Sequence, residues 1–298
     1  MAQRKGNKIS NKKTDNAMRN LFIEKIYNIC DGKKAEEVFL TYIKSDGTQD
    51  DITYRSFGLK CELLMQKFQK SILHRKDRVL LLTPMSPFGC IAVTALATSE
   101  LVSVVLNPQL PEEELDSLVK KSDISGIVCD EEIYQKYAYK WTQKYPVFNI
   151  KTGDLFFDGE YFSESSKDSD DDVLAILYSS GTTSEPKGVM ITYEAQMKSA
   201  ELLLRAFGTN DIRYLLVFPM FHVSGFSVFF ALLLGGGQIG LLENTNSIKL
   251  MDGFQKYKPN AFGMVPKVYE TFYTKIVSQL NNKKFAMKKL SFSGWLNE

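Results

Sequence analysis

The sequence predicts an α/β fold built on largely parallel sheets. Short aliphatic and β-branched runs alternate with longer segments of helical periodicity along most of the chain. This is the pattern of strands joined by crossover helices. With 298 residues, of which 44% are apolar or aromatic, the chain is long enough to bury a core without disulfides or a structural metal.

The first half of the chain contains the clearest strand and helix signals. Residues 38–43 and 51–54 predict a hairpin, because the turn-forming run Ser45-Asp46-Gly47 lies between them. Pro111 begins a helix with three glutamates in its first turn, where the helix dipole favours negative charge. The other predicted elements are helices over 56–69 and 91–97 and strands over 78–82, 101–106 and 124–129.

An acidic segment, residues 163–172 (SESSKDSDDD), has no apolar side chain and is predicted to be a linker. We therefore expect a first α/β subdomain over 21–162 and a second over 173–298. The alternation restarts after the linker. It predicts strands over 173–178, 214–218, 238–242, 261–265 and 289–292, and helices over 193–207, 225–234, 248–257 and 266–280.

Charge and cysteine content narrow the function classes. The 37 basic and 35 acidic residues lack the basic excess of a nucleic-acid-binding protein. Residues 1–14 hold five basic side chains and no acid, which predicts a disordered basic tail over 1–20; contact with a membrane or RNA is the weaker alternative. Four separated cysteines without a CxxC pair argue against a zinc site and favour a reducing, cytoplasmic location.

Residues 215–234 form an apolar run without formal charge. Its length would suit a membrane-spanning helix. Pro219 lies inside it, however, and proline interrupts helices. A strand, a turn and a buried helix are therefore the preferred interpretation, and no transmembrane segment is expected.

The segment with the strongest chemical signal is YSSGTTSEPKGV, residues 178–189. Hydroxyl donors, glycines that allow close backbone approach and one lysine together suit a phosphate group. A Walker loop is excluded, because the residues after Lys187 read as another strand; we expect a hairpin loop, with an ordinary serine- and threonine-rich turn as the alternative. The candidate ligands are Ser179, Ser180, Gly181, Thr182, Thr183, Ser184, Lys187 and Gly188.

This segment resembles the phosphate-binding signature of the adenylate-forming, or AMP-binding, enzyme superfamily. Ser184 departs from it, because the family has glycine there. Four further segments, 77–86, 106–115, 218–225 and 265–269, resemble other motifs of the family in the same order, so the resemblance covers about residues 35–298.

The resemblance implies two stacked, mostly parallel sheets flanked by helices, as in the N-terminal domain of these enzymes, with the small C-terminal domain absent. It also implies an AMP-forming acyl-CoA ligase that converts a carboxylic acid to an acyl-adenylate and transfers it to CoA. ATP, Mg²⁺ and CoA would be the cofactors and co-substrates. By the same resemblance, Thr183 would hold the metal.

The substrate class follows from FHVSG, residues 221–225. Amino-acid-activating members of the family carry an aspartate where this chain has His222. No carboxylate lies between residues 214 and 242, and burying an unpaired ammonium is costly. We expect His222 and Gly225 to line an apolar pocket together with Phe226, Val228, Phe229 and Phe230. A fatty acid is preferred and an aryl acid such as o-succinylbenzoate is the alternative; His222 as an ordinary core histidine also stays open.

Several family motifs are not found where the resemblance would place them. We identify no YGxTE motif and assign no TGD motif. The metal-binding glutamate and the adenylation lysine are likewise not matched. We therefore expect little or no ligase activity from this chain alone. Three interpretations stay open: a truncated N-terminal portion, a non-catalytic nucleotide- or acyl-binding protein, and one half of a split enzyme with a complementing C-terminal chain.

Overall fold

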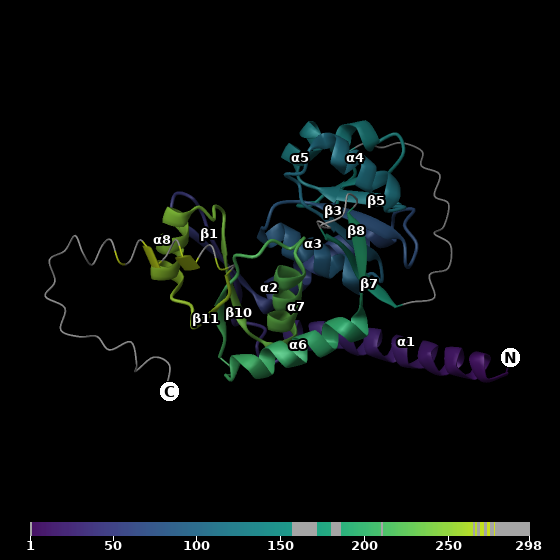
Figure 1. The fold of residues 1–298 in the computed structure, drawn as a ribbon, viewed down its shortest axis with the longest axis horizontal. Helices are drawn as coiled ribbons and strands as arrows, with labels where there is room; N and C mark the ends of the chain where they lie inside the picture. Colours follow the sequence, from purple (N-terminus) through teal and green to yellow (C-terminus); the bar gives the residue numbers. More distant parts are fainter. Residues whose placement is uncertain are drawn as a thin grey trace, which may run out of the picture.

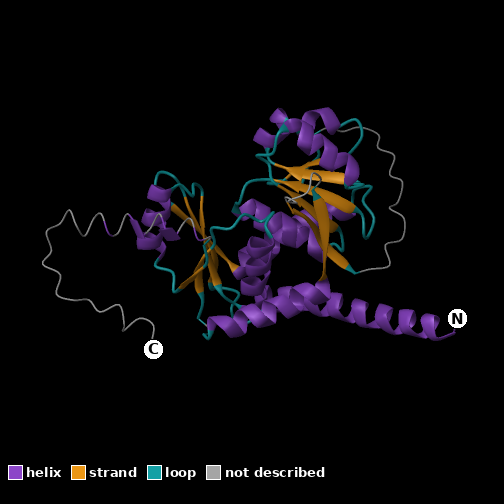
Figure 2. Cartoon of the chain, viewed as in Figure 1, coloured by secondary structure: helices purple, strands orange, loops and turns teal. Residues whose placement is uncertain are grey.

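The computed structural model describes residues 2–156, 172–179, 186–209 and 211–264, together with residues 266, 269–270, 273–274 and 277. Side chains are described from Asn16 onward. The described chain forms two sheets with helices between them and on both outer faces (Figures 1 and 2). The predicted fold class is therefore confirmed.

The larger sheet has the strand order β6-β5-β3-β4-β7-β8. All neighbouring pairs are parallel except β7 and β8, which are antiparallel. Its strands are β3 (Arg78–Leu82), β4 (Val102–Leu106), β5 (Gly126–Cys129), β6 (Val147–Asn149), β7 (Val173–Ser179) and β8 (Lys187–Thr192).

The smaller sheet has the order β11-β9-β10-β1-β2, and only its β1–β2 hairpin is antiparallel. Its strands are β1 (Val38–Ile43), β2 (Gln49–Thr53), β9 (Arg213–Leu215), β10 (Gln238–Leu242) and β11 (Ala261–Phe262).

The helices form three layers around these sheets (Figure 1). The layer between the sheets holds the C-terminal part of α1 (Ala2–Asp31) together with α2 (Tyr54–Gln69), α3 (Pro87–Thr98), α6 (Tyr193–Phe207) and α7 (Val223–Gly235). The outer face of the larger sheet carries α4 (Glu112–Lys121), α5 (Glu131–Lys136) and the 3₁₀ helix η1 (Ala138–Trp141), and that of the smaller sheet carries α8 (Ser247–Tyr257).

An aromatic cluster fills the layer between the sheets. The ring centroid of Phe229 on α7 lies 6.1 Å from that of Phe39 on β1, 6.4 Å from that of Phe57 on α2 and 5.0 Å from that of Phe230. All four side chains are fully buried. The rings therefore join the smaller sheet to two helices of the central layer, in the edge-to-face and tilted contacts that aromatic pairs prefer.

Local sequence signals explain where the helices begin. Thr53, Ser86, Thr192 and Asn246 each accept a hydrogen bond from a backbone N–H of the first turn that follows, which satisfies a donor that the helix itself leaves unpaired. As predicted, residues 215–234 do not form one helix: β9 ends at Leu215, earlier than the predicted strand end at 218, and the buried helix α7 begins at Val223 after a turn. Within the described residues, no helix has the length and apolar character needed to cross a membrane.

The predicted division into two consecutive subdomains does not match the sheets. β1 of the first half pairs with β10 of the second, and β7 of the second half pairs with β4 of the first. Parallel strands pair through crossovers, so chain order does not decide sheet membership. Residues 163–171 of the predicted linker lie outside the described residues, as does the strand predicted over 289–292.

The prediction of a disordered tail over 1–20 is also wrong at its C-terminal end. α1 is continuous from Ala2 to Asp31, and Arg19 is only 7% exposed. The composition of the segment does not reveal this burial, because Arg19 is buried through ion pairs with residues far along the chain, Glu100 and Asp172.

The four cysteines are all free and buried. Burial raises the pKa of Cys30 to about 12 and also raises the pKa values of Cys61, Cys90 and Cys129. We therefore expect a thiol-reactive chromophore at neutral pH to label the native chain slowly and the denatured chain at once. Fast stoichiometric labelling of the native chain would contradict this burial.

The same shifts predict a pH dependence of folding. An unfolded thiol has a pKa of about 8.5. Because folding raises the pKa, the contribution of the thiols to stability is complete below that pH and decreases as the pH rises above it. Urea unfolding as a function of pH should therefore show stability falling at alkaline pH.

Candidate functional site

The predicted phosphate-binding loop joins β7 to β8. These strands are antiparallel, with Ser179 opposite Lys187, so the predicted hairpin is confirmed. Of the eight candidate ligands, the structure describes the backbone of Ser179 together with Lys187 and Gly188. Ser180, Gly181, Thr182, Thr183 and Ser184 lie outside the described residues. Lys187 is exposed at the start of β8 and supplies positive charge beside the loop.

Gly188 packs closely against β7. A Cβ atom at this position would lie 3.0 Å from Cγ2 of Ile176 and 3.3 Å from Cζ of Tyr178. The Tyr178 ring is itself held, because its hydroxyl shares a 2.9 Å hydrogen bond with Oγ of Ser122. Gly188 therefore lets the tyrosine lie across β8 next to the loop.

A cleft of about 170 Å³ adjoins this hairpin. It lies at the carboxyl ends of β4 and β7, where open α/β sheets bind their ligands. The cleft brings together Pro186 from the loop, Phe221 and His222 from the segment before α7, and the segment that follows β4. Its lining is Val105, Leu106, Asn107, Leu110, Glu114, Leu118, Tyr178, Pro186, Phe221 and His222.

His222 occupies the N-cap position of α7. Its side chain is exposed, and its ring centroid lies 4.7 Å from that of Phe221. The backbone N–H of His222 donates a 3.1 Å hydrogen bond to the carbonyl of Pro219, which closes the turn before the helix. The interpretation of His222 as a core histidine is therefore wrong, and its ring is available to a ligand in the cleft.

Gly225 and its aromatic neighbours do not line this cleft. Gly225 is buried, and a Cβ there would come within 2.6 Å of the carbonyl oxygens of both Phe218 and Pro219. Its role is to let α7 start directly against that turn. Phe226, Phe229 and Phe230 are fully buried between the sheets, so these rings form core rather than the apolar pocket predicted for them.

The segment after β4 contributes cleft residues that the sequence analysis did not assign. Asn107, Leu110 and Glu114 all line the cleft. The sequence feature that points to these residues is their position, since residues 106–115 follow a buried strand and resemble a family motif. Sequence alone does not show that this strand end lies next to the end of β7.

A TGD tripeptide to which the sequence analysis assigned no role, residues 152–154, precedes the loop. It forms a turn after β6 in which Gly153 has φ of +73° and Asp154 pairs with Lys67 at 2.6 Å. Asp154 is thus engaged at the surface in an ion pair. No group of three histidine, cysteine, aspartate or glutamate side chains in the described part of the chain is placed to hold a metal.

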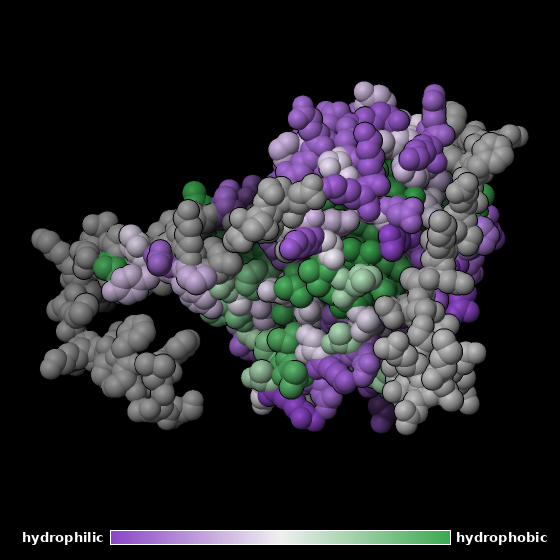
Figure 3. Space-filling view, turned by 45° about the vertical axis from the view of Figure 1, so that its right-hand side comes forward, coloured by the Kyte–Doolittle hydropathy of each residue, from purple (hydrophilic) through white to green (hydrophobic). Residues whose placement is uncertain are grey.

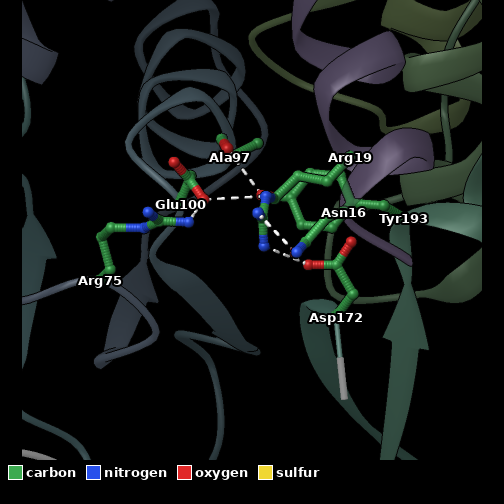
Figure 4. A network of polar contacts seen from close by, with 7 residues as sticks. All are labelled: Asn16, Arg19, Arg75, Ala97, Glu100, Asp172 and Tyr193. Atoms are coloured by element: carbon green, nitrogen blue, oxygen red, sulfur yellow. Dashed lines mark hydrogen bonds and ion pairs between the residues drawn. The ribbon is translucent and has the colours of Figure 1, made fainter. Parts of the chain in front are cut away.

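An ion-pair network anchors the start of β7, the strand that leads to the loop (Figure 4). Arg19 of α1 lies 2.6 Å from Asp172 and 2.8 Å from Glu100, and Glu100 also pairs with Arg75. Asp172 immediately precedes β7. Nearby, the hydroxyl of Tyr193 donates a 2.6 Å hydrogen bond to the carbonyl of Ala97.

Apolar side chains gather in the middle of the face seen in Figure 3. Exposed apolar residues near the site include Val189 and Met190 on β8 and Val223 at the start of α7. These side chains are 53%, 57% and 61% exposed. Exposed apolar side chains therefore lie on β8 and beside His222.

Comparison with curated proteins finds CoA ligases. The chain is 27% identical over 235 residues to 4-coumarate–CoA ligase 2 of Nicotiana tabacum, covering 72% of this chain and 43% of that protein. It is 23% identical over 300 residues to fatty acyl-CoA synthetase A of Dictyostelium discoideum, covering 91% and 44%. The chain thus spans less than half the length of these relatives.

Solved structures share the fold. The o-succinylbenzoate CoA synthetase of Bacillus subtilis bound to its acyl-adenylate intermediate superposes with a TM-score of 0.70 at 18% identity, over 84% of this chain and 50% of that one. A long-chain-fatty-acid-CoA ligase of Archaeoglobus fulgidus gives 0.73 at 19% identity, over 86% and 54%. A family model described as AMP-binding enzyme matches residues 30–297, and the chain belongs to this family.

Proposed function

We propose that this chain provides the ATP-binding and acid-binding half of an AMP-forming acyl-CoA ligase. The observation that carries the proposal is that Tyr178 of β7, Pro186 and His222 line one cleft, with Lys187 following Pro186 at the start of β8. Membership of the AMP-binding family supports ATP as the nucleotide. The CoA ligases among the relatives support CoA as the acceptor.

The residues proposed for the β7–β8 hairpin fit a bound nucleoside triphosphate. Lys187 is exposed at the mouth of the hairpin, where its charge can meet phosphate oxygens. Hydroxyl and backbone N–H donors from Ser179 to Ser184 would complete the cradle. Mg²⁺, held in part by Thr183, would neutralise charge on the phosphates during transfer.

The chemistry assigned to this chain is binding and orientation. The acid must attack the α-phosphate and expel pyrophosphate, so the carboxylate and the phosphate must be held in contact. The cleft would hold the acid with its carboxylate toward the loop. His222 would donate to that carboxylate or to the acyl oxygen, and Lys187 would stabilise negative charge that develops on the phosphates.

The substrate we propose is an apolar carboxylic acid, with a fatty acid preferred and an aryl acid as the alternative. Leu106, Leu110 and Phe221 give the cleft an apolar wall. In the presence of MgATP, hexadecanoate should raise the unfolding temperature more than 4-coumarate does, and glycine should not raise it. The variant His222→Asp should lose the shift, because it places a negative charge beside the acid, whereas Ile248→Asp on the exposed face of α8 should keep it.

We further propose that catalytic turnover needs the part of these ligases that the chain does not match, supplied on the same polypeptide or by a complementing chain. The support is that the match covers 43–44% of the curated relatives. ATP–pyrophosphate exchange by the 298-residue chain alone should therefore be at background with every acid tested. Exchange above background that Lys187→Ala abolishes would contradict this requirement while supporting the ligase assignment.

The location we propose is the cytoplasm. The four free cysteines support this reducing compartment.

A non-catalytic nucleotide- or acyl-binding protein is the second candidate function, and the Ser184 departure from the family pattern favours it. ATP–pyrophosphate exchange that appears when a complementing chain is added would support the ligase and contradict the non-catalytic role.

A further inference from the structure

A second surface, away from the cleft, combines exposed apolar side chains with lysines. Leu59 and Leu63 lie one turn apart on α2 and are 54% and 63% exposed. Phe88, in the first turn of α3, is 37% exposed. Residues four apart on a helix share a face, so the two leucines form one apolar ridge.

A groove of about 270 Å³ runs beside this ridge. Leu63, Leu64, Phe88, Ile91 and Ile150 give it apolar walls, and Lys60, Lys151 and Thr152 complete its lining. The ammonium of Lys151 lies 5.5 Å from the centroid of the Phe88 ring. We call Leu59, Lys60, Leu63, Phe88 and Lys151 the α2 patch.

The charges around the α2 patch are arranged asymmetrically. Lys60 and Lys151 line the groove, and Lys67 on the same helix pairs with Asp154 at 2.6 Å. The acidic residue Glu62 lies on the other side of the ridge, where it lines a different groove together with Leu59. The apolar groove is therefore bordered by cations on its own side.

We propose that the α2 patch docks the chain onto a bilayer that contains anionic lipids. Exposed leucine and phenylalanine side chains enter the boundary between headgroups and acyl chains, while flanking lysines meet lipid phosphates. The long lysine stems lie along the apolar surface with their ammonium groups at its rim. This proposal does not rest on the proposed ligase activity.

The test is sedimentation of the full chain with vesicles of phosphatidylcholine, with and without phosphatidylglycerol. We expect the chain to pellet with the anionic vesicles and to be released by salt. Lys60→Gln with Lys151→Gln should weaken binding about 25-fold, from about fivefold per lysine near an anionic surface. Leu63→Asp should weaken it by about tenfold or more, because the leucine no longer buries its surface in lipid.

Matched controls separate docking from folding. Leu202→Asp on α6 replaces a leucine of similar exposure, 66% against 63%, and Lys120→Glu reverses an exposed charge on α4; both should bind as the parent chain does. Absence of pelleting, equal binding to neutral vesicles, or unchanged binding by Leu63→Asp would overturn the proposal. A dimer in light scattering that Leu63→Asp dissociates would also overturn it, because a second copy would then occupy the patch.

Discussion

Replacing Arg19 by methionine should lower the free energy of unfolding by about 3–5 kcal/mol, the range for breaking a buried ion pair on one side. Methionine keeps much of the apolar stem while removing the guanidinium. Asp172, whose side chain is 9% exposed, and Glu100 would then lose the cation between them. Urea denaturation monitored by circular dichroism measures the change.

Two further variants test the cause of this loss. Arg205→Met removes an exposed arginine that pairs with Glu201 one turn away, and exposed pairs contribute about 1 kcal/mol or less. The double variant Arg19→Met with Asp172→Asn should recover part of the lost stability, since it also removes the buried charge that Arg19 neutralises in the parent chain. If Arg19→Met is no more destabilising than Arg205→Met, the ion pairs of Arg19 with Glu100 and Asp172 do not hold α1 in place.

The second large effect is expected at Phe229. Its ring is fully buried and contacts rings from β1, α2 and α7. Phe229→Ala would leave a cavity between the sheets, and such truncations cost about 3–5 kcal/mol. Urea unfolding should show this loss with an unchanged slope against denaturant concentration.

The control for this truncation is Leu202→Ala, which removes apolar atoms from a side chain that is 66% exposed. Its effect should stay within about 0.5 kcal/mol, as for surface changes. A loss at Phe229→Ala as small as that at Leu202→Ala would mean that Phe229 points into an open pocket, as the sequence analysis proposed, rather than into the core.

Periodic patterns allowed many elements to be predicted from the sequence. The strands predicted over 78–82 and 238–242 and the helix over 193–207 match β3, β10 and α6 residue for residue. Local signals suffice there, because each segment is bounded by turn or capping residues. The elements α5, η1 and β6 were not predicted, since these short segments lack the aliphatic run that marks β3 and β10.

The site was predicted less completely, for a topological reason. The loop and His222 each lie in a recognisable motif, and the structure brings Pro186 and His222 to one cleft. The contribution of Asn107 and Glu114 depends on β4 lying next to β7 in the sheet. Chain order does not give that adjacency. The same reason explains why Phe229 was placed in a pocket, since an apolar run does not reveal which face meets the core.

Nucleotide binding is the measurement that tests the proposed function most directly. MgATP should be titrated by calorimetry into the 298-residue chain, Lys187→Ala and the control Lys198→Ala, which removes an exposed lysine paired with Glu194. Hydrogen bonds to charged groups contribute about 1.5–3 kcal/mol, so we expect the chain and the control to bind alike and Lys187→Ala to bind at least about tenfold more weakly. Equal affinity in all three proteins, or no binding by any of them, would contradict an ATP site at the β7–β8 hairpin.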